Sequence, residues 1–599
     1  MIYNPLDKFY KSFIGAIPDN QVITFRVKGQ FDSVVFVLRK DGQSDCARFV
    51  MQKNDDYFEI QLKIERGLYF YCFDISNGKF IGKSKDHVGV ISNDPKWFQL
   101  TSYDHSYSVP DWIYGGVIYQ IFPDRFYSYD KQKTAPNGKV LHESWDETPV
   151  YLPNEKGKII NNDFFGGDIK GIIEKLDYLS SLGVTAIYLN PIFKAYSNHR
   201  YDTGDYMQID SLLGSEEDFI SLIKTAENKG IKIILDGVFN HTGDDSLYFN
   251  KYGNYNSVGA YQSKSSPYYE WYNFTQFPDK YESWWGIETL PQTNETNEGF
   301  VDFITGKDGV LEHYTKLGVG GWRLDVVDEL PTEFVRKIRS AIKNVNADGI
   351  VIGEVWEDVS NKISYGKRRE YFQGYELDSA MNYPLKNAII TFVKYGNSKE
   401  LSNVIKEQLD HYPHVALNAM MNIISTHDTM RLLTAVGGQD ASRMSKVQMA
   451  ETVISDDNIR DAKFKLKVAS LLQFTLCGVP SIYYGDEAGM QGYADPLNRK
   501  TYPWGKEDIE IIEWYKFLGQ LRKDYSAFTK GEFIEVFLSN GAYAFVRKDE
   551  KSELLVAVNV SDKDLNIEFD GELYELIKND EIVNGFELKA RDCAVIIKK

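Results

Sequence analysis

An arginine and an aspartate lie two residues apart in a short apolar segment, GGWRLDVVDEL, at 320–330. Side chains two residues apart on a β-strand point to the same face, so Arg323 and Asp325 would meet there. Such a pair on a buried strand indicates either a structural ion pair or a strand that ends at an active site, where the Asp325 carboxylate does chemistry. The segment alone does not decide between these two interpretations.

Further polar residues follow other apolar, strand-like segments of the chain. They are Asp236, Asn240 and His241 in LDGVFNH, Glu354 in IGEVW, and His427 and Asp428 in ISTHD. In one pocket, the carboxylates of Asp325, Glu354 and Asp428 would repel each other, so at least one should have a raised pKa and hold a proton near neutral pH. A protonated acid beside an ionised carboxylate is the equipment for glycoside cleavage, because one group acts on the anomeric carbon while the other protonates the leaving oxygen.

The remaining polar side chains fit the same chemistry. The guanidinium of Arg323 would orient Asp325 and keep it ionised as a nucleophile. His241 and His427 would donate hydrogen bonds to sugar hydroxyls. For any one of these residues a purely structural role is at least as common, but polar residues at the same end of successive strands are harder to explain by structure alone.

The elements that must position these residues alternate between strand and helix. Apolar strands are predicted at 116–122, 184–192, 231–241, 321–327, 349–356, 417–428 and 478–487, with helices between them, such as 172–183 and 331–345. Repeated βα units predict a parallel sheet closed into an eight-stranded (β/α)8 TIM barrel, with an open doubly wound sheet as the alternative. In a barrel the carboxyl ends of the strands converge, and strands four to seven would supply Asp325, Glu354 and Asp428.

The chain is too long for one core, and its pattern divides it into domains. Residues 1–112 read as β-strands separated by turn signals, which predicts a β-sandwich. The barrel would occupy 113–515, with 242–300 as an inserted, aromatic-rich lid subdomain, since long ordered loops are usually functional. Strands return at 516–599 and predict a C-terminal β-sandwich domain.

Composition narrows the possible partners. The formal net charge of -18 disfavours nucleic acid and anionic membranes. The four cysteines lack a CxxC spacing, so neither a disulfide framework nor a zinc site is expected. No signal peptide and no apolar run of membrane-spanning length is visible, so we expect a cytoplasmic protein. Aromatic residues make up 14% of the chain, which fits either large cores or sugar binding.

Taken together and in order, the motifs resemble the α-amylase superfamily, glycoside hydrolase family 13, over the whole chain. The matching segments are VIYQIFPDRF (117–126), DGVFNH (236–241), LPQTN (290–294), GWRLDVVDE (321–329), GEVW (353–356), ISTHD (424–428) and GVPSIYYGDE (478–487). The N-terminal module, the YQIFPDRF strand and the lid segment are most similar to the cyclomaltodextrinase–neopullulanase–maltogenic amylase group.

This resemblance implies a role for each residue at the strand ends. Asp325 would be the nucleophile, Glu354 the general acid/base and Asp428 the transition-state stabiliser. Around them, the resemblance places Arg323, His241, His427, Tyr201, His199 and Asp202 at the sugar to be cleaved, Trp356 and Glu329 on the acceptor side, and Asp236 and Asn240 as hydrogen-bonding supports of the strand ends. The chain departs from the group at Asp328, where an asparagine is usual, so acceptor-side specificity stays open.

The resemblance also implies a possible structural calcium ion, although no cofactor is required for the reaction. Relatives often bind calcium through the loop after the PxRF motif, and here Asp130, Asp168 and the carbonyl of Gly167 match that site. Two carboxylates are few for an ion that takes six to eight oxygens, and the NND segment at 161–163 could add to them.

The resulting expectation is a retaining α-glucan hydrolase with some transglycosylation. It would cleave α-1,4 linkages of cyclodextrins, pullulan, starch or maltooligosaccharides through a covalent glucosyl–Asp325 intermediate. The alternative within the superfamily is an α-1,6-acting pullulanase-type or glucan-transferring enzyme. A binding protein without catalysis is disfavoured, because all three carboxylates are present. The resemblance further implies a homodimer formed through the N-terminal module.

Overall fold

The computed structural model describes residues 1–136, 138–569, 571–582 and 586–598. Its centre is a ring of parallel strands, which follow one another in chain order around the ring. They are β11 (Ile118–Ile121), β14 (Ala186–Leu189), β17 (Lys232–Gly237), β20 (Gly321–Leu324), β21 (Ile350–Gly353), β24 (Ser379–Ala380), β25 (Met421–Ile423) and β26 (Val479–Tyr483). β26 pairs with β11, and a parallel bridge between Met381 and Met421 joins β24 to β25. The predicted barrel is confirmed, and the open sheet is wrong.

The barrel strands form where short apolar runs are buried on both faces, as parallel sheets require. Outer helices cover them with one apolar stripe each. Helix α4 (Glu216–Glu227) starts at a Ser215 capping box, and α7 (Thr332–Val345) buries Phe334, Val335, Ile338 and Ile342. The helix predicted at 172–183 is split at Lys175 into α2 (Ile169–Glu174) and α3 (Leu176–Ser181). Further helices are α5 (Glu298–Thr305), α6 (Val310–Lys316), α8 (Tyr383–Tyr395), α9 (Ser398–His411), α13 (Asp456–Thr475) and α14 (Ile509–Asp524).

The N-terminal module is a sandwich of two sheets, with strands within residues 17–103, around an aromatic core that includes Phe25, Phe36, Tyr71 and Phe98. One sheet has β1 (Ile17–Pro18), β3 (Val35–Lys40), β4 (Ala47–Val50), β7 (Gly67–Asp74), β8 (Phe80–Lys83), β9 (Gly89–Ser92) and β10 (Phe98–Tyr103). The other has β2 (Val22–Lys28), β5 (Gln52–Lys53) and β6 (Tyr57–Lys63).

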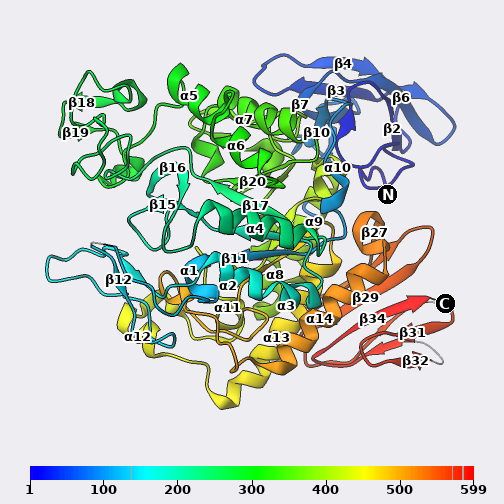
Figure 1. Ribbon diagram of the computed structural model, residues 1–599. Coiled ribbons are helices and arrows are strands. Elements are labelled where there is room, and N and C mark those ends of the chain that lie inside the picture. The colour runs from blue at the N-terminus through cyan, green and yellow to red at the C-terminus, as the bar shows by residue number, and fades with distance from the viewer. Residues whose placement is uncertain (137, 570, 583–585, 599) are drawn as a thin grey trace.

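The C-terminal module places two sheets over a smaller core. The boundary predicted at 516 falls inside α14, and the strands of the module begin at β27. The larger sheet runs β27 (Glu532–Ser539), β28 (Ala542–Lys548), β29 (Glu553–Asn559), β34 (Asp592–Lys598), β31 (Leu573–Glu575) and β32 (Asp580–Ile582). The smaller pairs β30 (Leu565–Ile567) with β33 (Phe586–Leu588). In Figure 1 both terminal modules lie on the right of the barrel.

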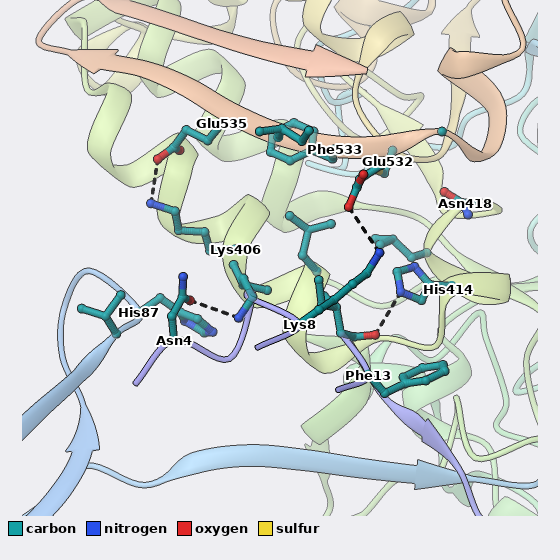
Figure 2. Close-up of a pocket in the computed structure, with 18 of the residues that line it drawn as sticks. Asn4, Lys8, Phe13, His87, Lys406, His414, Asn418, Glu532, Phe533 and Glu535 are labelled. Carbon is teal, nitrogen blue, oxygen red and sulfur yellow. Dashed lines mark hydrogen bonds and ion pairs between the residues drawn. The ribbon is translucent and has the colours of Figure 1, made fainter. Parts of the chain in front are cut away.

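The N-terminal module, the barrel and the C-terminal module meet around a cavity of about 690 Å³. Figure 2 shows the ion pairs that cross it, Lys8 with Glu532 at 3.5 Å and Lys406 with Glu535 at 2.8 Å. Beside the cavity, Asp410 of α9 binds both Lys11 and His87 of the N-terminal module, all of them buried. These contacts attach the N-terminal module firmly to the barrel.

The insert at 242–300 lies on the opposite side of the barrel, on the left in Figure 1. Its regular structure is β18 (Phe274–Gln276), β19 (Lys280–Tyr281), short 3-10 turns and, at its end, the start of α5 (Glu298–Thr305). Packed aromatic rings hold it together; Phe249, for example, stacks on Phe274 and meets Tyr272 and Tyr281 edge-on. Within the residues that the structure describes, no helix combines the length and apolarity needed to cross a membrane.

The loop after α1 (Pro123–Phe126) does not fit the calcium site that the resemblance implied. The Lys133 ammonium donates to the Gly166 carbonyl at 2.5 Å and to Asp168 Oδ2 at 2.7 Å. Asp168 also caps α2 by accepting from Gly171 N, while the Asp130 carboxylate accepts from Gln132 N. The described residues contain no group of three His, Cys, Asp or Glu side chains placed to hold a metal. A lysine thus supplies the positive charge between these oxygens.

We therefore expect this loop to depend on Lys133 and not on calcium. Replacing Lys133 with alanine leaves the nearly buried Asp168 carboxylate without its cation and should cost about 2 kcal/mol of unfolding free energy. Calorimetry of the wild type with EDTA or added calcium should give the same Tm. The exposed neighbour Lys131→Ala is the control. A wild-type Tm that rises on calcium addition would contradict this prediction.

Candidate active site

Arg323 is the centre of a cluster of carboxylates at the carboxyl ends of three adjacent barrel strands. Its Nη1 donates to Asp236 Oδ1 and to Asp325 Oδ1, each at 2.8 Å. Its Nη2 lies 2.7 Å from Glu354 Oε2. The guanidinium is fully buried, and Asp236 and Arg323 occupy paired positions of β17 and β20. The predicted meeting of Arg323, Asp325 and Glu354 is confirmed.

Three carboxylates around one guanidinium cannot all ionise without a charge penalty. Burial raises the pKa of Asp325 well above its ordinary range against the opposing charge of Arg323, and the Glu354 and Asp236 carboxylates raise it further. Burial also raises the pKa of Asp236 against the effect of Arg323. Groups this close titrate together, so the pKa of Asp325 depends on the charge of Asp236 as well as on that of Arg323.

Glu354 is held by the turn that follows Asp325. Val326 is in the left-handed region, with φ 39°, and its backbone N donates to Glu354 Oε2 at 3.0 Å. The other carboxyl oxygen, Oε1, accepts from Trp356 Nε1 at 3.1 Å. Trp356 itself stacks on Tyr383 at 3.8 Å between ring centroids and is 45% exposed in the cleft. A strained backbone position next to two acidic groups is typical of a functional site.

Asp428 lies in the same cleft, beside a neutral histidine. Gln120 Nε2 donates to His427 Nδ1 at 2.8 Å, so the His427 proton is on Nε2, which is 3.1 Å from Asp428 Oδ2 and 2.6 Å from Tyr201 Oη. Burial lowers the pKa of His427, and Arg499 lowers it further. Burial raises the pKa of Asp428, which Arg499 opposes.

Tyr201 joins the two halves of the site. Its hydroxyl donates to Asp236 Oδ2 at 2.8 Å, and its ring stacks on His427 at 5.3 Å with an interplanar angle of 5°. One ring face is thus already occupied by an imidazole.

His241, His199 and Asp202 also line the cleft, and each makes a hydrogen bond to a backbone group of the protein. His241 Nε2 contacts the Tyr201 carbonyl at 3.1 Å, and burial lowers the pKa of His241 to about 4. His199 Nδ1 accepts from Tyr201 N. Asp202 accepts from Ser197 N, and burial raises its pKa to about 6.

One prediction for a supporting residue needs correction. Asn240 was expected to hold its strand end through side-chain hydrogen bonds, as Asp236 does. Instead, its carbonyl accepts from Thr293 N of the lid, and its buried amide finds no partner among the described residues. The backbone therefore makes the connection, because the strand end meets the lid edge-on.

The cleft has a volume of about 960 Å³ and includes residues that the sequence did not single out. Arg499 Nε donates to the His427 carbonyl at 2.9 Å, and its Nη2 is 3.5 Å from Asp428 Oδ1. Trp284 and Trp285 of the lid form another wall. Arg499 follows the eighth strand within a polar loop, DPLNRKTY, whose spacing carries no signal; the paired tryptophans were visible as an aromatic run.

On the far side of Glu354, Asp328 and Glu329 point in different directions. Asp328 accepts from Tyr371 Oη at 2.8 Å and pairs with Lys362 Nζ at 3.0 Å, so it supports a loop and does not face the cleft. Glu329 Oε1 accepts from Trp285 Nε1 at 2.7 Å at the cleft rim. The site as a whole brings the carboxyl groups of Asp325, Glu354 and Asp428 around one open space, an arrangement that suits glycoside cleavage.

Comparison with known proteins agrees with this geometry. The family described as "Alpha amylase, catalytic domain" matches residues 120–517. An amylopullulanase of Thermoanaerobacter thermohydrosulfuricus is 35% identical over 90% of this chain and 40% of that protein. The chain spans between 33% and 48% of the length of the three amylopullulanases it matches.

Two further proteins match along most of their length. A cyclomaltodextrinase of Thermoanaerobacter pseudethanolicus is 31% identical over 85% of this chain and 82% of that protein. A solved structure named cyclomaltodextrinase superposes with a TM-score of 0.72 at 26% identity and covers 98% of both chains. With the barrel, the strand-end carboxylates and these matches, the chain belongs to the α-amylase family, glycoside hydrolase family 13.

Proposed function

We propose that the protein is a retaining α-glucan hydrolase that cleaves α-1,4 linkages of cyclodextrins, pullulan, starch or maltooligosaccharides, with some transglycosylation. The observation that carries the proposal is the placement of Asp325 and Glu354 on opposite nitrogens of one buried guanidinium at the floor of a long cleft. Relatives named cyclomaltodextrinase, neopullulanase and maltogenic α-amylase support the substrate class.

In this mechanism Asp325 attacks the anomeric carbon while Glu354 protonates the leaving oxygen. The C–O bond to the leaving sugar breaks, a covalent glucosyl–Asp325 ester forms, and Asp428 supports the positive charge that develops on the sugar. Water or an acceptor hydroxyl then attacks the ester, with Glu354 taking its proton, and Asp325 is released. Arg323 stays charged throughout and keeps Asp325 aimed.

A homodimer formed through the N-terminal module, as the resemblance implied, stays a prediction. Several apolar side chains of that module, among them Val22 and Val50, are exposed and would suit such an interface. Light scattering that gives the mass of a single chain would contradict it.

The role of Asp325 as nucleophile and that of Glu354 as general acid can be tested separately with a substrate whose leaving group needs no proton. Glu354→Gln should lower kcat on maltooligosaccharides by about 100- to 10,000-fold, because general acid catalysis is lost. With α-maltosyl fluoride the same variant should still form the ester, and intact-mass spectrometry should find the added maltosyl unit. Asp325→Asn should form no adduct, and the exposed Glu550→Gln should behave as the wild type. An adduct on Asp325→Asn would reject the assignment.

The acidic limb of the pH profile should report the Asp325 pKa. Asp325 must be ionised to attack, so kcat/KM rises with pH through that pKa, which burial places above the ordinary value of about 3.9. Asp236→Asn removes a neighbouring negative charge and leaves more of the Arg323 charge to Asp325. The acidic limb of the pH profile, measured on the residual activity of this variant, should therefore move to lower pH by about one unit. A limb that stays in place or moves to higher pH would contradict the coupling between Asp236 and Asp325.

A product profile would show which glycosidic linkage the enzyme cleaves and which substrate it prefers. Purified protein is incubated separately with β-cyclodextrin, pullulan and soluble starch, and the products are resolved by chromatography. We expect cyclodextrin to be opened faster than starch is cleaved, with panose from pullulan. Maltotriose from pullulan would favour the α-1,6-acting alternative, which the match to amylopullulanases supports.

A further inference from the structure

Asp358 is a junction of hydrogen bonds in the loop that follows the fifth barrel strand. Its Oδ1 accepts from the backbone N and the Oγ of Ser360, at 2.9 and 2.6 Å, and so caps a short 3-10 turn. Its Oδ2 accepts from Asn361 Nδ2 at 3.2 Å and from His411 Nδ1 at 2.9 Å. Both oxygens are therefore engaged. Three of the four donors are local, whereas His411 belongs to α9.

His411 uses its side chain for this one hydrogen bond. The imidazole is 4% exposed, and its Nε2 is buried without a hydrogen-bond partner within the part of the chain that the structure describes. A buried ring nitrogen without a partner is unfavourable, so what the histidine contributes here is the donor at Nδ1. Burial would raise the pKa of Asp358, but the hydrogen bond from His411 lowers it below its ordinary value. Asp358 is thus held as a carboxylate.

The N-terminal module fixes the end of α9 next to His411. Asp410 is fully buried there and binds both Lys11 and His87 of the module, His87 through Nε2 at 3.0 Å. Separating a buried ion pair would strand a charge, so the helix end cannot easily move away from the module. One residue after His411, a backbone carbonyl accepts from Ala16 N at 3.1 Å. The imidazole is thus itself held by a separate module.

The same module also contacts the loop directly. Gln99 of β10 donates through Nε2 to Ser360 Oγ and accepts at Oε1 from Asn361 Nδ2, each at 2.7 Å. These are two of the side chains that donate to the junction. Farther along the loop, Arg368 binds Asp41 through Nε at 2.8 Å and Nη2 at 2.9 Å. All of these contacts lie within one chain, so they need no second subunit.

The loop that is held in this way carries the support of Glu354. Glu354 Oε1 accepts from Trp356 Nε1 at 3.1 Å, and Trp356 stacks on Tyr383. The indole is half-exposed in the cleft, so the stack and its own backbone must keep it in place. Asp358 anchors that backbone two residues later. A displacement of about 1 Å of a catalytic group can cost about 100-fold in rate, so this anchoring bears directly on proton transfer.

We propose that Asp358 and His411 are positioning residues for the general acid: their hydrogen bond holds the loop after Glu354 so that its carboxyl group meets the leaving oxygen. The N-terminal module secures the pair from the same chain, through the end of α9 and through Gln99. Neither Asp358 nor His411 lines the cleft, so both act through Glu354 and not on the substrate. The inference rests on the proposed function and gives the N-terminal module a part in it.

The test separates a reaction that needs the general acid from one that does not. Full-length enzyme is assayed on maltotriose, whose leaving oxygen must be protonated, and on α-maltosyl fluoride in a single turnover with enzyme in excess. In the fluoride reaction the C–F bond breaks, the Asp325 ester forms and fluoride leaves without a proton. A misplaced general acid slows only the first reaction, whereas damage to the cleft or to the nucleophile slows both.

Asp358→Asn keeps the shape of the side chain but leaves one acceptor oxygen where four donors converge. It should lower kcat on maltotriose by about 10- to 100-fold and leave KM and the single-turnover fluoride rate within about 2-fold. Asp440→Asn is the matched control. Asp440 caps the 3-10 turn Ala441–Arg443 by accepting from Ser442 N and Oγ, and it does not line the cleft. This control should match the wild type in both assays.

His411 is tested by two variants that differ in one donor. In His411→Asn the amide can place an N–H near the position of Nδ1, whereas His411→Leu has no donor to offer Asp358. His411→Leu should lower kcat on maltotriose by about 10-fold without changing the fluoride rate, and His411→Asn should restore most of that loss. Leucine also removes the unpartnered Nε2, so a lower Tm is not expected to explain its effect. If Asp358→Asn does not fold, this pair decides.

The part of the N-terminal module is tested at Gln99. Gln99→Met keeps the length of the side chain and removes both hydrogen bonds to the loop. It should lower kcat on maltotriose by a smaller factor than Asp358→Asn, again with an unchanged fluoride rate. A Gln99→Met enzyme equal to the wild type would overturn the role of the module.

The outcomes separate the two proposals. Wild-type kcat on maltotriose in Asp358→Asn and His411→Leu, or equal losses in both assays, would overturn the positioning role and leave the hydrolase proposal standing. A wild-type enzyme that cleaves neither the fluoride nor any glucan would overturn the proposed function itself. So would a Glu354→Gln enzyme with wild-type kcat on maltotriose, because Glu354 would then not be the general acid.

Discussion

The buried guanidinium of Arg323 is the interaction on which the site depends. Taking a charge out of water costs several kcal/mol, and only close, well-oriented partners recover that cost. Arg323 has such partners in Asp236, Asp325 and Glu354, each from a different strand. The barrel supplies the geometry, because parallel strands in register bring these positions to one level. Loss of that register would leave a bare charge in the core.

The chemistry follows from this shared cation. Burial raises the pKa values of Asp325 and Asp236, and the charge of Arg323 opposes both shifts, so this one cation helps to keep the carboxyl groups ionisable. Burial lowers the pKa of His427 and so keeps its imidazole uncharged. The Tyr201 hydroxyl contacts both His427 and Asp236 and thereby connects them. Support then extends outward through the Val326 turn to the loop after Glu354, and from there to the N-terminal module through Asp41 and Gln99.

Much of this arrangement could be predicted from residue patterns. Seven of the barrel strands lie within apolar runs that predicted them, and Asp325 and Glu354 directly follow two of these strands. The sixth strand, β24, could not be predicted, because two residues, Ser379 and Ala380, make no periodic pattern. The loop of the implied calcium site shows a related limit: Asp130 and Asp168 match a ligand pattern in the sequence, but only folding brings the Lys133 ammonium to Asp168. Arg499 was missed because an isolated loop arginine has no spacing to mark it.

The sequence by itself determined the fold class, the family and the three acidic groups at the strand ends, because hydrophobic period and residue type are local properties that survive without coordinates. The tertiary structure alone decided which charges share a partner, which way Asp328 and Glu329 point, and that Trp285 of the lid donates to Glu329. Those contacts join residues tens or hundreds of positions apart, and no local pattern encodes them. They exist because the closed barrel and its attached module place separate loops at one rim.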